Sequence, residues 1–348
     1  MSRTAPMTAA RHALELSREQ ILAHRRHVQA LDERLPPGPE SLRRAAWAGL
    51  QDSMPRAALL SIHARVADTP PDILDDSSLA QVWGPRFSAY VVAERDRAPF
   101  TLGRFPDDAR GRRVALETAA AIERQLGGRR MGYGELGREL GVHGNSFRYA
   151  TTTGTVAIHW EGARQPEIWT VPAPDIEPGE ARLELARRFL HVFGPTTPAA
   201  LAKWAGIGPA EARGAFEALA DQLTEVRTPI GDAAILAPDE AAFRAAAGPP
   251  AAARLLPSGD TYYLLWGTDR ELLVPEPDRR DSLWTSRVWP GAVLAGGEIV
   301  GVWRRSDSEV SVEPWRRLSA AERDAIEAEA ASLPLPGLRR AIGLRWST

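Results

Sequence analysis

Apolar and polar residues follow a helical period through the first organised part of the chain. The segment 17–31 carries a broken apolar stripe, with a serine placed to cap its first turn. Prolines end this helix, and further helices are expected over 40–50 and after Pro55. Alternating runs at 86–94 and 98–105 then predict the two strands of a hairpin. Three helices followed by a strand pair favour a winged helix over a plain helical bundle.

The same order of elements is expected a second time. Between Leu140 and Asn145, a glycine-containing turn fits the corner of a helix-turn-helix. A strand pair turning at Gly162 should follow the helices. The expected helices and strands of this unit are 112–126, 133–141, 143–156, 156–162 and 166–171.

A third copy has the clearest boundary signals. Thr197 is placed as a helix cap, and Pro198 and Pro209 stand at the first positions of two helices. The copy comprises 180–194, 197–226 and a strand at 232–238. The three copies share an order of elements and no fixed repeat length.

Strands dominate from Arg254 onward. The pair Gly296-Gly297 separates two apolar runs and predicts a tight hairpin. An acidic helix over 319–333 should close this part, because Ser319 and Glu322 suit a capping box. We therefore predict an α+β fold of tandem winged-helix units followed by a small β-barrel or curled sheet. The predicted divisions are 1–110, 111–178, 179–249 and 250–348.

Composition excludes several classes of chemistry. The 348 residues contain no cysteine, so disulfides, thiol nucleophiles and thiolate zinc sites are excluded. The seven histidines form no HxxxH or HExxH pattern, and neither nucleotide-binding nor GxSxG motifs occur. We therefore expect no metal, no cofactor and no nucleotide. Without a long apolar run or a recognisable leader, we expect a cytoplasmic protein, off the membrane and monomeric.

The net charge of −2 argues against a protein that coats nucleic acid. Lys203 is the one lysine among 43 basic residues. Two interpretations of this arginine excess stay open: a GC-rich coding bias, or a use of bidentate contacts to phosphate.

Four blocks, in order, resemble the AlkZ/YcaQ group of DNA glycosylases. They are "GLQDSMPRAALL" from Gly49, "VWGPRFSAYVV" from Val82, "ELARRFLHVFGPTTPAALAKWAGI" from Glu184 and "VWPGAVLAGGEIVGVWRR" from Val288. The resemblance runs from about residue 17 to about residue 333. It implies tandem winged helices and a barrel around a concave surface that fits duplex DNA. It also implies activity on alkylated or crosslinked bases, often as a defence against a DNA-damaging natural product.

That group carries Gln-X-Gln or Gln-X-Asp on a loop that orients the attacking water. The corresponding residues here are Gln51, Asp52 and Ser53, a divergent version with Ser53 at the second polar position and Asp52 at the usually apolar middle position. Base excision passes through an oxocarbenium-like cation, which needs a water acceptor and a negative charge. Gln51 can orient the water, and Asp52 can act as base and counter-charge. In an extended loop Asp52 faces away from Gln51, whereas Ser53 faces correctly but is short. Alternatively, Asp52 and Ser53 merely cap the next helix.

Two functions therefore stay open. One is a monofunctional glycosylase for alkylated or bulky-adduct bases in duplex DNA, and the other is a catalytically silent winged-helix DNA-binding or regulatory protein. Arg86 falls where the group carries an arginine near the damaged nucleotide, and Tyr90 falls where relatives often have histidine. The segment from Asn145 opens a recognition helix or is buried between units, and the arginines after "VGVW" reach DNA or solvent. The predicted DNA-binding residues are Arg56, Arg86, Tyr90, Asn145, Arg148, Arg304 and Arg305.

Overall fold

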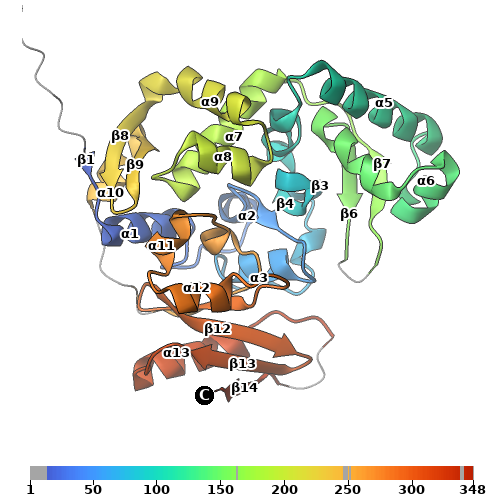
Figure 1. Ribbon diagram of the computed structural model, residues 1–348. Helices are drawn as coiled ribbons and strands as arrows, with labels where there is room; N and C mark the ends of the chain where they lie inside the picture. Colours follow the sequence, from blue (N-terminus) through green and yellow to red (C-terminus); the bar gives the residue numbers. More distant parts are fainter. Residues whose placement is uncertain (1–13, 162–163, 246–249, 251, 338–340, 348) are drawn as a thin grey trace, which may run out of the picture.

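The described part of this α+β chain forms three sheets with helices around them (Figure 1). The computed structural model describes residues 14–161, 164–245, 250, 252–337 and 341–347. The predicted turn at Gly162 and the predicted boundary at 249 lie outside the described residues. None of the described helices has the length and apolarity needed to span a membrane.

The first unit holds the predicted helices but a different hairpin. β4 lies within the predicted strand 86–94, but its antiparallel partner is β3, with Leu79 opposite Ala93. The predicted strand 98–105 is wrong, because this segment is helical. The elements of the first unit are β1 (Leu14–Glu15), α1 (Arg18–Val28), α2 (Pro39–Ala45), β2 (Leu50–Gln51), α3 (Ala57–His63), η1 (Ile73–Asp75), β3 (Leu79–Trp83), η2 (Pro85–Phe87), β4 (Ala89–Ala93), η3 (Glu94–Asp96), α4 (Arg97–Phe100) and η4 (Leu102–Arg104).

Local hydrogen bonds and a buried arginine explain the helical form of 98–105. Thr101 Oγ1 donates to the carbonyl of Arg97 at 2.8 Å, a bond across one helical turn. Phe100 is fully buried, and the buried Arg104 guanidinium donates to the carbonyls of Trp83 and Ala205. Tertiary burial therefore overrides the alternating pattern that suggested a strand.

The second unit shares a sheet with the first. β3 meets β6 at the pair Gln81 and Ile158, which gives a six-stranded sheet of order β2-β4-β3-β6-β7-β5. The predicted strand pair is present as β6 and β7, and the predicted third helix is a 3-10 helix. The elements are α5 (Ala109–Leu126), β5 (Met131–Gly132), α6 (Tyr133–Leu140), η5 (Gly144–Thr153), β6 (Val156–His159) and β7 (Glu167–Thr170).

The third unit follows its predicted caps closely. Thr197 Oγ1 accepts from the amide of Ala200, with Pro198 as the first residue of α8, and α9 begins at Pro209. Strand β1 lies parallel to β8, so the N-terminal segment joins this unit's sheet. The elements are α7 (Pro178–Phe193), α8 (Pro198–Ala205), α9 (Pro209–Ala218), η6 (Ala220–Gln222), β8 (Leu223–Thr228), β9 (Gly231–Leu236), η7 (Ala237–Asp239) and α10 (Glu240–Arg244).

The C-terminal part forms an open five-stranded sheet, so the barrel alternative does not hold. Its order is β10-β11-β12-β13-β14, and Gly296 and Gly297 take positive φ angles of 58° and 83° in the predicted hairpin. Ser319 and Glu322 form the predicted capping box of α13. The elements are β10 (Arg254–Leu256), η8 (Thr261–Tyr263), α11 (Asp269–Leu273), α12 (Pro277–Leu283), β11 (Gly291–Ala295), β12 (Glu298–Ser306), β13 (Glu309–Pro314), α13 (Ala320–Ala331) and β14 (Gly343–Trp346).

A buried ion pair joins the first unit to the C-terminal part. Arg65, just after α3, donates to both carboxylate oxygens of Asp260 at 2.7 and 2.8 Å. Asp260 also accepts from Ser61 Oγ at 2.6 Å and from the amide of Tyr262 at 2.9 Å. Both charged side chains are almost fully excluded from solvent. The carboxylate is therefore fully hydrogen-bonded, which a buried charge requires.

Replacing one member of this pair should destabilise the fold strongly. We expect Asp260→Asn to lower the free energy of unfolding by about 3–5 kcal/mol, because a buried guanidinium loses its counter-charge. Chemical denaturation followed by circular dichroism measures the change. Glu40→Gln, which breaks the exposed pair with Arg95, is the control and should cost less than about 1 kcal/mol. Equal losses in the two variants would contradict the assignment.

Candidate functional site

The motif loop begins at the end of a short edge strand. β2 ends at Gln51, which lies opposite Tyr90 of β4. The amide of Asp52 continues the pairing by donating to the carbonyl of Ala89 at 2.8 Å. The chain then turns through Ser53 into α3. Because the strand fixes the backbone, side chains 51 and 52 are directed to opposite sides, as the extended geometry predicted.

Gln51 is half-buried and held by Arg86. Arg86 Nη2 donates to Gln51 Oε1 at 3.0 Å, while its Nη1 donates to the carbonyl of Trp204 at 3.1 Å. The guanidinium also lies over the Trp266 ring, 4.3 Å from its centroid. A carbonyl oxygen has two lone pairs, so Oε1 keeps one for a water molecule. Arg86 therefore orients Gln51, whereas the sequence analysis placed it among the predicted DNA-binding residues.

Asp52 is buried against α3 and β3. Its Oδ1 accepts from the amide of Ala58 at 3.0 Å, and its Oδ2 accepts from Gln81 Nε2 at 3.2 Å. Asp52 thus binds an amide in the first turn of α3, although Arg56 occupies the N-cap position and the Asp52 side chain is only 3% exposed rather than solvated. Burial raises the pKa of Asp52 to about 6, and the Ala58 bond opposes this in part. A carboxyl with this pKa can exchange a proton near neutral pH.

Ser53 borders a cavity of about 360 Å³ between the first and second units. Trp83 and Phe87 come from the first unit, and Tyr133, Arg148 and Trp160 come from the second. The half-buried Arg148 has an Nε with no hydrogen-bond partner among the described residues. The cavity therefore combines flat aromatic walls with one cation beside the motif loop.

A second cavity of about 360 Å³ lies on the other side of the loop. Met54 and Pro55 form one wall, and Trp289, Arg304 and Arg305 form another. Arg304 is exposed, whereas partial burial and the nearby charge of Arg56 lower the pKa of Arg305. Three of the predicted DNA-binding arginines, Arg56, Arg304 and Arg305, therefore lie at or near the second cavity.

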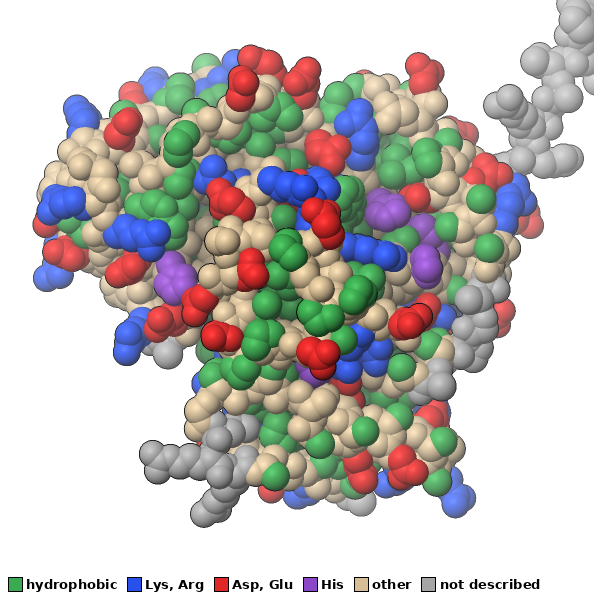
Figure 2. Space-filling model, turned by 180° about the vertical axis from the view of Figure 1, so that it is seen from behind, with side chains coloured by type: hydrophobic (Ala, Val, Ile, Leu, Met, Phe, Trp, Pro, Cys, Tyr) green, Lys and Arg blue, Asp and Glu red, His purple; other side chains and the backbone are tan. Residues whose placement is uncertain are grey.

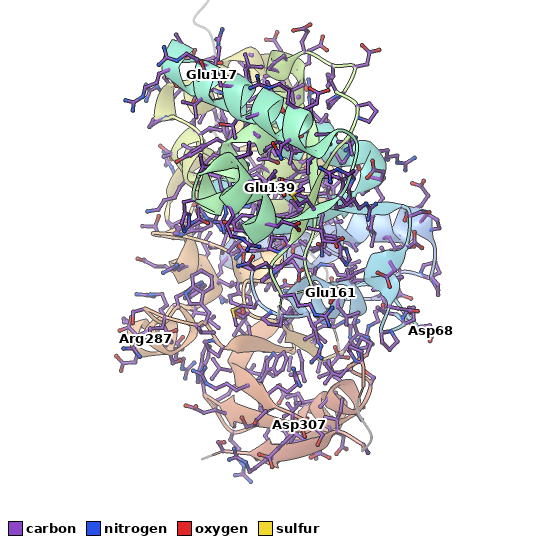
Figure 3. The ribbon with its side chains drawn as sticks, turned by 90° about the vertical axis from the view of Figure 1, so that its right-hand side faces the viewer. Asp68, Glu117, Glu139, Glu161, Arg287 and Asp307 are labelled. Carbon is purple, nitrogen blue, oxygen red and sulfur yellow. The ribbon has the colours of Figure 1, made fainter. Side chains whose placement is uncertain are left out.

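The two cavities border a hollow in the molecule. Seen from behind, the outline is indented between the second unit and the C-terminal sheet (Figure 2). Figure 3 looks onto that side, where Glu161 after β6 lies above Asp307 of the β12–β13 turn, with Arg287 to one side. Neighbours of these labelled residues, Trp160 and Arg305, line the first and second cavity respectively.

Tyr90 and Asn145 differ in their access to this surface. Tyr90 is fully buried, which corrects the expectation of a direct contact to DNA. Burial raises the pKa of its hydroxyl, and the charges of Arg86 and Arg104 oppose the shift. Asn145 is exposed and accepts a hydrogen bond from the Tyr133 hydroxyl at 2.7 Å. It remains available at the edge of η5.

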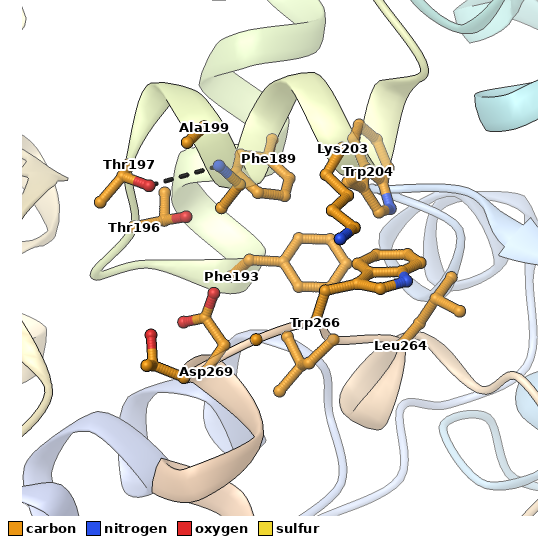
Figure 4. A pocket seen from close by; sticks show the side chains of 14 residues that line it. Phe189, Phe193, Thr196, Thr197, Ala199, Lys203, Trp204, Leu264, Trp266 and Asp269 are labelled. Atoms are coloured by element: carbon orange, nitrogen blue, oxygen red, sulfur yellow. Dashed lines mark hydrogen bonds between the residues drawn. The ribbon is translucent and has the colours of Figure 1, made fainter. Parts of the chain in front are cut away.

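A third pocket, of about 210 Å³, lies behind Trp266 (Figure 4). Phe193 and Trp266 form its apolar walls, and Lys203 reaches toward both rings from α8. The Arg86 guanidinium lies over the Trp266 ring, so this ring separates the pocket from the hydrogen bond between Arg86 and Gln51.

Sequence reasoning missed Gln81 as a neighbour of the motif, and it missed Trp266 and Lys203 as neighbours of each other. Gln81 also bonds the backbone of Trp160 through both its amide nitrogen and its oxygen. A polar residue within the apolar strand "LAQVW" was the available signal for Gln81. Trp266 and Lys203 come close only through the tertiary fold.

Comparisons with known proteins agree with this architecture. The family model described as "DNA glycosylase AlkZ-like" matches residues 44–334. An interstrand DNA cross-link repair glycosylase of Streptomyces sahachiroi is 27% identical over 237 residues, which span 65% of this chain and 60% of that protein. The solved structure of the S. sahachiroi DNA glycosylase AlkZ has a TM-score of 0.78 and 22% identity, covering 96% of this chain and 100% of its own; this likeness concerns the fold. The chain belongs to the AlkZ-like DNA glycosylase family.

Proposed function

We propose that this chain is a DNA glycosylase that hydrolyses the N-glycosidic bond of an alkylated or bulky-adduct base in duplex DNA. One observation carries the proposal: Gln51 is held by Arg86 on a loop between two cavities that arginines border. Family membership and a relative named as a cross-link repair glycosylase support the same activity.

The reaction requires a water, a base and charge stabilisation. Water attacks the anomeric carbon of the sugar, the carbon–nitrogen bond breaks, and its electron pair leaves with the base. In our proposal the free lone pair of Gln51 Oε1 orients the water. The Asp52 carboxylate faces the other side of the strand in the free protein, so the loop must twist when DNA binds to let Asp52 accept the proton of this water. Above its pKa of about 6, Asp52 also supplies negative charge near the cationic transition state. Ser53 would contact the substrate from the first cavity.

DNA binding falls to the arginines on either side of the loop. Arg148 would meet the strand at the first cavity, Arg304 and Arg305 would meet it at the second, and Arg56, whose charge acts on Arg305, would bind nearby. Arg86 has a positioning role in this proposal, because Gln51, Trp204 and Trp266 already engage its guanidinium.

The silent DNA-binding alternative rests on a specific observation. Both Asp52 oxygens already bind protein groups, one at the start of α3 and one on Gln81. A carboxylate used in this way supports the fold without any catalysis. Under this alternative the arginines still bind duplex DNA, and the motif loop is purely structural.

An excision assay separates the two functions. On duplex DNA with N7-alkylguanine or N3-alkyladenine, we expect Gln51→Ala to slow single-turnover excision by about 100-fold, because the water loses its acceptor. Gln222→Ala, an exposed glutamine of η6, is the matched control and should keep the wild-type rate. Salt-sensitive binding by the wild type without any abasic sites would favour the silent alternative.

The rate should depend on pH through Asp52. Excision should rise with pH through an apparent pKa of about 6, because the deprotonated carboxylate is the active form. Asp52→Asn should be slow and nearly independent of pH over the same range. A wild-type profile that is flat near pH 6 would argue against Asp52 as the base.

Stability provides an independent check of that pKa. Folding raises the pKa of Asp52 from 3.8 to about 6, so the protonated form favours the folded state. This contribution to the free energy of unfolding is complete below pH 3.8 and is lost as the pH rises through about 6. Wild type should therefore lose up to about 3 kcal/mol relative to Asp52→Asn across this interval. Parallel stability curves would show that the pKa is not raised.

The late hairpin should contribute to the salt dependence of DNA binding. Each phosphate contact adds about 0.9 to the slope of log K against log salt, so Arg304→Ala with Arg305→Ala should reduce the slope by about 2. Arg213→Ala, an exposed arginine of α9, serves as the control and should leave the slope unchanged. An unaltered slope in the double variant would show that this hairpin does not contact DNA. Fluorescence anisotropy at several salt concentrations measures the slope for each variant.

A further inference from the structure

Two histidines and an aspartate meet on the side of the molecule where α1 packs against α7. Histidine side chains gather on this rear face in Figure 2. His24 comes from α1, His191 from α7 and Asp239 from η7. One ring nitrogen of each histidine and one carboxylate oxygen all lie within 4.8 Å of one another. The motif loop and its two cavities use none of these residues.

The His24 ring is held in a state that suits a ligand. Its Nε2 lies 3.1 Å from the carbonyl oxygen of His191, which can only accept, so Nε2 carries the hydrogen. Nδ1 then bears the lone pair, and it is buried without a hydrogen-bond partner among the described residues. The ring also stacks on Phe243, with centroids 3.7 Å apart. Metal-binding histidines characteristically donate their second nitrogen to a carbonyl or carboxylate.

His191 and Asp239 complete a preformed corner. Nδ1 of His191 lies 2.9 and 3.1 Å from the two carboxylate oxygens of Asp239. Ligands of one tetrahedral ion lie about 3.4 Å apart, given metal–ligand distances near 2.1 Å. The distance between His191 Nδ1 and the Asp239 oxygens already approaches this value. Small rotations of the side chains would therefore bring all three ligand atoms to the distances that one ion requires.

A cavity of about 540 Å³ leads to these groups from solvent. His24, His191 and Asp239 line it, together with His27, which is one helical turn beyond His24 and exposed. Glu40, Arg43 and Arg44 also line the cavity, and the Asp96 carboxylate neutralises the charge of Arg43 at 2.7 and 3.0 Å. The cavity gives an ion a path from solvent, and a water molecule can fill its fourth position.

We propose that His24, His191 and Asp239 bind a divalent transition-metal ion of the zinc class, which fastens α1 to α7 and η7. Two imidazoles and a carboxylate are a ligand set that such ions accept. The sequence analysis predicted no metal because motifs such as HxxxH reveal only ligands that are a few residues apart. Here the ligands lie at positions 24, 191 and 239, on three separate elements.

Metal titration of the full-length chain tests the site directly. The probe is Co²⁺ added to metal-stripped protein, with the visible d–d absorption as readout, followed by competition with Zn²⁺. We expect one tightly bound ion per chain and a rise in Tm of at least about 3 °C at saturating Zn²⁺. Wild-type protein that takes up no Co²⁺ and shows no thermal shift would overturn the proposal.

Variants locate the ion. Asp239→Asn preserves shape, so its circular dichroism without metal should match the wild type while its affinity for Co²⁺ falls at least about 10-fold. His24→Ala should lose the absorption as well. His159→Ala, a half-exposed histidine 3.8 Å from Glu161, is the matched control and should bind as the wild type does. Unchanged binding in Asp239→Asn and His24→Ala, or an equal loss in His159→Ala, would show that the ion sits elsewhere.

Discussion

The buried pair of Arg65 and Asp260 is the constraint on which the rest of the arrangement depends. It fastens the end of α3 to the segment that leads from β10 into η8. The motif loop lies immediately before α3, and Gly259, next to Asp260, approaches the Gln51 amide. The loop therefore lies beside two segments that this buried pair holds together. Such a pair fixes geometry rather than adding much net stability, because desolvation offsets most of the attraction between the charges.

Arginine has an internal use in this chain besides any contact with DNA. The buried Arg25 donates to the carbonyls of Phe193, Gly194 and Pro195, and Arg104 and Arg254 bind backbone carbonyls in the same way. A guanidinium with five donors satisfies carbonyls at the ends of helices that would otherwise lack partners. The arginine excess is thus partly structural, which neither coding bias nor phosphate binding had suggested.

Local signals predicted the elements well where short-range chemistry determines them. The caps at Ser17, Thr197 and Ser319 and the Gly296-Gly297 turn all depend on residues within a few positions of one another. The segment 98–105 was mispredicted because its alternation reflects burial of Phe100 and Arg104 by distant elements.

The sequence could predict where in the chain the site lies, but not which residues surround it. Gln51 and Asp52 stood out by resemblance, and their opposite directions followed from the strand. The partners that determine what each can do, Arg86, Gln81 and Ala58, lie up to 35 residues away. Tyr90 appeared accessible by its place in a motif, yet it is fully buried in the main hydrophobic core. Environment, rather than identity, separates a contact residue from a core residue.

The Gln81 side chain links the motif loop to the point where the sheet of the first unit meets that of the second. It donates to Asp52 and simultaneously bonds the backbone at Trp160, where the sheet passes from the first unit to the second. The two parts of the sheet are joined at a single pair of residues, Gln81 and Ile158. Any shift of one part against the other would therefore act on the same amide that binds the Asp52 carboxylate.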